Sequence, residues 1–131
     1  MTILERVREL DLPLDQVVVI ASGVLDALGL RKAGDVDLVL SPELFESLSV
    51  RDDWIQSIKH NEPMLTRGDV EAFLSWGSDA VPNFRELYDD GIAVDGIRFA
   101  NPRFVINWKK QRMSDKDVAD IALLEEYLQR V

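Results

Sequence analysis

The sequence has no cysteine and a single histidine, His60, among its 131 residues. Without thiols it can form neither a disulfide framework nor a zinc site built from thiolates. It also lacks any apolar run of the roughly 18–20 residues that cross a bilayer. The first ten residues carry acidic side chains and no long apolar stretch, so we expect no signal peptide. These absences predict a cytoplasmic protein without a membrane segment.

Positive charge is also scarce in this chain. It has 24 acidic and 15 basic residues, which gives a net charge of −9. General binding to nucleic acid is therefore not expected, because phosphate contacts need local positive charge. Residues 96–114 are the exception, since they contain no acidic residue but five basic ones: Arg98, Arg103, Lys109, Lys110 and Arg112. This basic stretch is either a solvated helix face or a binding place for phosphates.

The spacing of apolar residues predicts a single domain of helices and strands over residues 1–131. Helices are expected at residues 3–10, 22–28, 42–48, 83–88 and 102–113, and after a cap at Ser114. Ser41 and Asn101 are the expected caps of the helices that begin at residues 42 and 102. The last helix has apolar residues on one side: Val118, Ile121, Leu124, Leu128 and Val131. Strands are expected at residues 17–21, 36–40, 54–58, 70–76, 92–94 and 97–99. Turn signals stand at residues 61–63 and 67–68, and no further strand is expected between them. The pattern predicts an α/β (α+β) fold, with a small mixed β-sheet flanked by helices and two C-terminal helices.

Two acidic residues stand at the start of the second expected strand. Asp35 and Asp37 are two residues apart, so a strand places them on one face, with Cα atoms roughly 6–7 Å from each other. Two carboxylates at the mouth of a buried strand are costly unless a cation lies between them. A divalent metal ion, Mg²⁺ or Mn²⁺, is the natural candidate.

A turn of small residues precedes these acids. Ala21, Ser22 and Gly23 lie between the first strand and the next helix, where backbone N–H groups are free to bind an anion. An anion site beside a metal site is what a nucleoside triphosphate with Mg²⁺ requires, because Mg²⁺ commonly takes one or two carboxylates plus substrate phosphates.

The pattern Ala-Ser-Gly, eleven residues, then Asp-Val-Asp-Leu-Val-Leu resembles the signature of the nucleotidyltransferase superfamily related to DNA polymerase beta. Residues 23–48 and 106–128 also resemble small bacterial members of that superfamily. The resemblance implies a nucleotidyltransferase-like fold and the transfer of a nucleoside monophosphate from a triphosphate to an acceptor. It also implies that Asp35, Asp37 and a third acid on a nearby strand hold two metal ions. One ion would activate the acceptor hydroxyl and the other would stabilise the pyrophosphate.

Glu71 is the predicted third acid, because it lies within an apolar strand segment and needs a reason to be there. It would also help to deprotonate the acceptor. Asp69, two residues away on the same face, is the alternative. Asp95 is better explained by the Asp95-Gly96 hairpin turn.

The triphosphate has its own predicted binding groups. The amides of Ser22 and Gly23 would hold the terminal phosphates, with help from Lys109 and Arg112, which share a helix face. Arg31 would either contact phosphate or neutralise the nearby aspartates.

Other features leave the function open. Ala21 stands where the superfamily has glycine, and it adds a Cβ where the backbone should approach phosphate. The alternative function is therefore a non-catalytic binding or interaction module of the same fold, for example one partner of a toxin–antitoxin-like pair. Trp76 and Trp108 either stack on a base or belong to the core. His60 is expected in a solvated turn.

Overall fold

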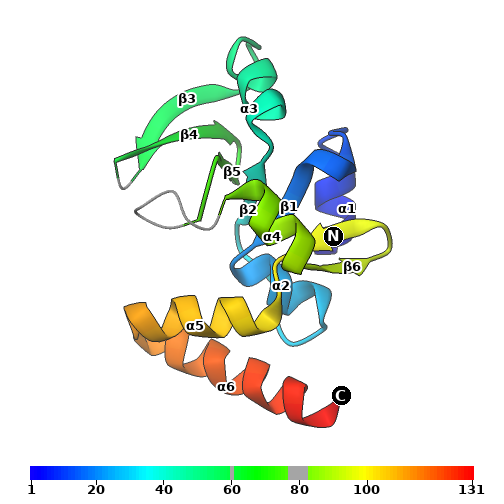
Figure 1. The fold of residues 1–131 in the computed structure, drawn as a ribbon, viewed down its shortest axis with the longest axis vertical. Coiled ribbons are helices and arrows are strands. Elements are labelled where there is room, and N and C mark those ends of the chain that lie inside the picture. Colours follow the sequence, from blue (N-terminus) through cyan, green and yellow to red (C-terminus); the bar gives the residue numbers. More distant parts are fainter. Residues whose placement is uncertain (60, 77–82) are drawn as a thin grey trace.

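The computed structural model describes residues 1–59, 61–76 and 83–131, and His60 lies outside these residues. The strands are β1 (Val17–Ile20), β2 (Val36–Leu40), β3 (Ile55–Lys59), β4 (Glu62–Arg67), β5 (Val70–Phe73), β6 (Ile92–Val94) and β7 (Ile97–Phe99). The helices are α1 (Ile3–Arg8), α2 (Ser22–Ala27), α3 (Pro42–Ser49), α4 (Phe84–Asp90), α5 (Pro102–Arg112) and α6 (Asp115–Arg130), and a short 3₁₀ helix spans Leu14–Gln16. The strands form a seven-stranded mixed sheet in the order β3-β4-β5-β2-β1-β7-β6 (Figure 1). The expected α+β class is confirmed.

The middle of the sheet combines both pairing directions. β1 pairs with β2 in antiparallel fashion and places Ile20 opposite Asp37. β2 pairs with β5 in parallel fashion and places Asp37 opposite Glu71. Residues that are opposite each other on paired strands point to the same face of a sheet. Ile20, Asp37 and Glu71 therefore form one row across three strands.

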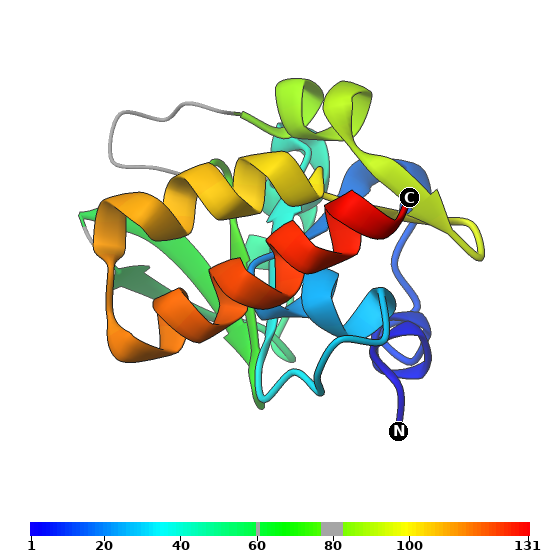
Figure 2. The ribbon, with the colours of Figure 1, turned by 90° about the horizontal axis from the view of Figure 1, so that it is seen from below.

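Helices cover both faces of the sheet around β1, and all four residues of this strand are buried. α2 contacts β1 and β2, and α1 contacts α2 and β2. α4 also contacts β1, and it lies on the opposite side of the sheet from α1 in Figure 2. This two-sided burial explains why residues 17–20 form a continuous apolar run rather than an alternating one.

The two C-terminal helices pack against each other as a hairpin (Figure 2). Asn101 caps α5 by accepting a hydrogen bond from the backbone N–H of Arg103, and Met113, at φ 49°, ends the helix. Ser114 caps α6 in a capping box with Asp117. Both cap positions are as the sequence predicts. None of the described helices is long and apolar enough to span a membrane.

The strand β4 is the main element that the sequence analysis misses. It lies between β3 and β5, and its second residue is Pro63, opposite Ile58. Proline and the flanking turn signals favour a loop in this segment, so the sequence pattern does not indicate the strand. The pairing of β4 with β5 begins only at Met64, so the missing N–H of Pro63 removes no bond from that ladder. The predicted strand at residues 70–76 is also shorter, because β5 ends at Phe73.

Gly23 permits the close packing of α2 on β1. A Cβ at this position would lie 2.5 Å from Val19 Cγ1 and 3.5 Å from Ile3 Cδ1. We expect Gly23→Ala to lower the free energy of unfolding by about 1–3 kcal/mol, because overpacking forces the stiff valine out of place. Urea denaturation followed by circular dichroism measures this loss. Gly34→Ala is the matched control, since its Cβ would meet nothing within 4 Å. Equal stability of the two variants would contradict this packing role.

Candidate functional site

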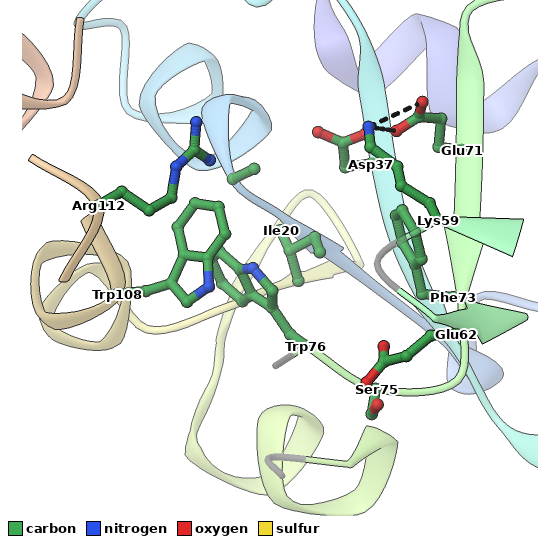
Figure 3. Close-up of a pocket in the computed structure, with 11 residues that line it drawn as sticks. Ile20, Asp37, Lys59, Glu62, Glu71, Phe73, Ser75, Trp76, Trp108 and Arg112 are labelled. Atoms are coloured by element: carbon green, nitrogen blue, oxygen red, sulfur yellow. Dashed lines mark hydrogen bonds and ion pairs between the residues drawn. The ribbon is translucent and has the colours of Figure 1, made fainter. Parts of the chain in front are cut away.

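A cleft of about 570 Å³ opens between the sheet, the β3–β4 hairpin and α5 (Figure 3). Its walls carry charged and aromatic side chains together with three small or aliphatic ones. The lining residues are Ile20, Ala21, Asp37, Lys59, Glu62, Glu71, Phe73, Ser75, Trp76, Trp108 and Arg112. The row formed by Ile20, Asp37 and Glu71 lies on the sheet side, and Trp108 and Arg112 come from α5. Concave sites with a few convergent charged groups are the usual places for small-molecule binding.

The carboxylates of Asp37 and Glu71 lie side by side because β2 and β5 pair in parallel register. The Lys59 ammonium donates to both oxygens of Glu71, at 3.1 Å from Oε1 and 2.9 Å from Oε2 (Figure 3). A carboxylate pair with one cation upon it is the arrangement that reduces the repulsion between the two acids.

The environment of Asp37 raises its pKa to about 6, first through burial and then through the negative charge of Glu71. The Lys59 ammonium lowers this pKa, whereas the charge of Asp35 raises it further. Asp37 therefore changes its charge near neutral pH, as few aspartates do.

The predicted acids are only partly brought together. Glu71 lies beside Asp37, as the choice of third acid requires. Asp35 is exposed just before β2 begins at Val36, and it does not line the cleft. Face alternation holds only within a strand, so the expected placement of Asp35 beside Asp37 in the site does not follow from the spacing. Asp69, the alternative, forms an ion pair with Arg6 instead.

Within residues 1–59, 61–76 and 83–131, no three histidine or acidic residues are grouped so that they could hold a metal ion. The Asp37–Glu71 pair supplies only two carboxylates. Mg²⁺ is often held by one or two carboxylates together with substrate phosphates. The pair therefore suits an ion that completes its coordination with water or phosphate oxygens, and the three-acid site stays a prediction.

Lys109 and Arg31 do not line the cleft, and both belong to an ion-pair network that joins the segment after α2 to the helices α5 and α6. Arg31 donates to Asp120 from Nε at 2.6 Å and from Nη2 at 2.7 Å. The buried Lys109 ammonium lies 3.0 Å from Asp120 and 3.4 Å from Asp117. Burial alone would raise the pKa of Asp120, but hydrogen bonds from Arg31 and Lys109 lower it on balance. The structure thus places these two cations on aspartates rather than at a phosphate site.

This network also corrects the expected orientation of the last helix. The sequence places Val118 with Ile121 and Leu124 on one apolar side of this helix. Val118 is half exposed, and Asp117 and Asp120 are buried with Ile121 and Leu124. The helix rotates its acidic side inward because Lys109 and Arg31 neutralise it there.

Arg112 is the member of the basic stretch that reaches the cleft. It lies on α5, across the cleft from Asp37 and Glu71 (Figure 3). Its guanidinium is centred 4.5 Å from the Trp108 ring, and its Nε lies 3.5 Å from Asp117. About half of the side chain is exposed, so it remains open to a further partner. Of the two cations expected to help hold phosphates, Arg112 lines the cleft with the acidic pair and Lys109 does not.

An aromatic wall lies beside Arg112 in Figure 3. The rings of Trp76 and Trp108 have centroids 4.6 Å apart, and Trp76 also packs against Phe104 at 5.0 Å. Trp76 is buried in the core, whereas Trp108 is partly exposed. Trp76 therefore belongs to the core and also borders the cleft, whereas Trp108 has an exposed part on which a base could stack.

The turn before α2 has an unusual backbone. Ala21 lines the cleft and has φ 57° and ψ −135°, a region that residues with a Cβ rarely adopt. Gly23 is buried against Val19, so close packing is the visible reason for this glycine. Ser22 begins α2 but does not line the cleft. Phosphate binding by the Ser22 and Gly23 amides stays a prediction.

Sequence reasoning missed Lys59 and Glu62 as cleft residues. Both lie at the end of the β3–β4 hairpin, opposite each other in the register. The missed strand β4 concealed this pairing, so no local signal pointed to Lys59 as the partner of Glu71.

Comparison of the chain with models of known protein families finds no match, and comparison with curated proteins finds none that is similar.

Asp37 makes the stability of the protein depend on pH. Its pKa is raised when folded, to about 6, so the folded state holds this proton more tightly than the unfolded chain. The resulting stabilisation is complete below about pH 4 and is lost as the pH rises through about 6. At pH 7.5 we expect Asp37→Asn to unfold with about 1–2 kcal/mol more free energy than the parent, and this difference should vanish at pH 4.

Urea denaturation at several pH values measures this difference. Asp52→Asn, at an exposed position outside the cleft, is the control with the same charge change. A pH-independent difference between the parent and Asp37→Asn would contradict the raised pKa.

Two neighbouring lysines of α5 test the ion-pair network. The Lys109 side chain is 4% exposed between two aspartates, whereas Lys110 is 54% exposed and lies 4.0 Å from Glu125. We expect Lys109→Ala to cost roughly 3 kcal/mol of unfolding free energy, because it leaves buried charges unpaired. Lys110→Ala should cost less than about 0.5 kcal/mol. Denaturation curves of both variants check this contrast, and similar losses would refute it.

Proposed function

We propose that this protein is a magnesium-dependent nucleotidyltransferase, which moves a nucleoside monophosphate from a nucleoside triphosphate to an acceptor. One observation carries this proposal. The Asp37–Glu71 pair and the Arg112 guanidinium line opposite sides of the same cleft (Figure 3). A triphosphate with its cation needs carboxylates on one side and positive charge on the other.

The donor chemistry of the cleft fits Mg²⁺ or Mn²⁺. Asp37 and Glu71 offer adjacent carboxylate oxygens, which are the ligands that these ions prefer. When bound, the metal ion supplies positive charge that stabilises the phosphates and the pyrophosphate leaving group.

The chain's own residues have separate roles in this proposal. Arg112 binds the phosphates, since a guanidinium matches their geometry. Trp108, held against Trp76, offers a flat apolar surface for the base. Glu71, which lines the cleft beside Asp37, would help to deprotonate the acceptor. A cytoplasmic location and a protein partner belong to the same proposal, which names no acceptor and expects no general binding to nucleic acid.

A second function is favoured by two specific observations. Ala21 occupies a strained conformation in the turn where the motif has glycine, and Asp35 stays outside the cleft. These departures favour a non-catalytic module that binds a ligand or a partner chain without transfer, as in a toxin–antitoxin-like pair.

Nucleotide binding separates the two functions. We expect the parent to bind at least one of ATP, GTP, CTP and UTP in the presence of Mg²⁺, as measured by isothermal titration calorimetry. Arg112→Ala should weaken this binding by about 1.5–3 kcal/mol, which is the contribution of a hydrogen bond to a charged group.

Arg103→Ala is the matched control, because Arg103 is exposed on the same helix and does not line the cleft. It should leave the affinity unchanged. If the parent binds none of the four nucleotides with Mg²⁺ present, the transferase proposal falls and the module remains.

A further inference from the structure

Lys59 contacts the Asp37–Glu71 pair although its strand, β3, is not adjacent to β5 or β2 in the sheet. It ends β3, where it is opposite Glu62 of β4, whereas Glu71 is opposite Thr66 of β4. The ammonium therefore approaches Glu71 from beyond β4, at the tip of a hairpin that lies on the edge of the sheet. The pairing of neighbouring strands does not by itself bring these two side chains together, and their contact puts a positive charge directly on the candidate metal site.

The charges of the cleft do not suffice for two divalent ions. Asp37 and Glu71 are the acids that line the cleft at this position. Asp35 is exposed before β2 and acts on Asp37 through its charge, and Asp69 pairs with Arg6. Glu62 lies apart, near Ser75, in Figure 3. Two metal ions about 3.5–4 Å apart need bridging and flanking oxygens, which two carboxylates do not supply. A second dication would also meet the ammonium on Glu71 and be repelled by it.

We infer that Lys59 supplies the second positive charge of the site, so that Asp37 and Glu71 bind one divalent ion rather than two. This inference rests on the proposed function and changes the metal content that the sequence resemblance implies. The lysine side chain is 42% exposed on a flexible stem, so its ammonium can stay near Glu71 or turn to a bound phosphate without a change in the fold.

The inference fixes both the number of ions and the effect of Lys59 on them. We expect the parent to bind one Mn²⁺ per chain when the metal alone is titrated and free Mn²⁺ is measured by electron paramagnetic resonance. Lys59→Gln should bind Mn²⁺ about fivefold more tightly, because it removes a like charge within a few ångströms of the ion. Lys59→Arg keeps the charge and should keep the affinity of the parent within about twofold.

Lys110→Gln is the matched control, since it changes the net charge equally at an exposed position outside the cleft. It should not alter Mn²⁺ binding, and Asp37→Asn should abolish it. Circular dichroism confirms that each variant is folded before titration.

Two outcomes overturn the inference and leave the proposed function intact. One is the binding of two Mn²⁺ ions by the parent, and the other is an unchanged or weaker affinity in Lys59→Gln. If neither the parent nor Lys59→Gln binds Mn²⁺, the inference and the metal dependence of the proposed function both fail.

Discussion

The parallel pairing of β2 with β5 is the constraint on which the candidate site depends. It fixes Asp37 opposite Glu71, while the antiparallel partner β1 places Ile20 on the other side of Asp37. Two carboxylates held in this way repel each other, and burial increases the cost of their charge. Burial and the charge of Glu71 raise the pKa of Asp37, and the ammonium of Lys59 lies on Glu71 beside it.

A second constraint is the ion-pair network that joins α5 and α6. Lys109 is buried between Asp117 and Asp120, and Arg31 holds Asp120 from the segment after α2. Buried ion pairs are costly to break, although they add little over apolar packing. The basic residues of this segment therefore have different contacts. Lys109 joins α5 to α6, and Arg112 lines the cleft.

The turn at Ala21 shows where the sequence departs from what the cleft would need for easy approach of a phosphate. A non-glycine residue at φ 57° stores backbone strain, and it lies beside the acidic pair. Strained residues gather at functional sites, where surrounding structure holds them in place. The same turn is also the strongest reason to keep a non-catalytic module in view, because its Cβ occupies space beside the cleft.

The sequence by itself determined the local elements. The caps at Ser41, Asn101 and Ser114, the hairpin around Asp95-Gly96 and the buried runs in β1 and β2 depend on neighbouring residues, and they form as expected. It also indicated Asp37 and Glu71 as candidate site residues, since an acidic residue within an apolar strand needs a partner for its charge. It missed β4, because Pro63 and the turn signals around it hide a strand whose proline meets no β5 neighbour.

Only the tertiary structure decided the partners of the charged side chains. Lys59 meets Glu71 from beyond β4, and Lys109 turns to aspartates eight and eleven residues further along the chain. The acidic side of α6 faces inward for the same reason. Periodicity ranks residues by hydrophobicity and treats an aspartate as solvated, whereas a buried aspartate is stable once cations from other elements surround it. Strand order and helix packing determine which cation contacts which acid, and the local sequence pattern indicates neither of them.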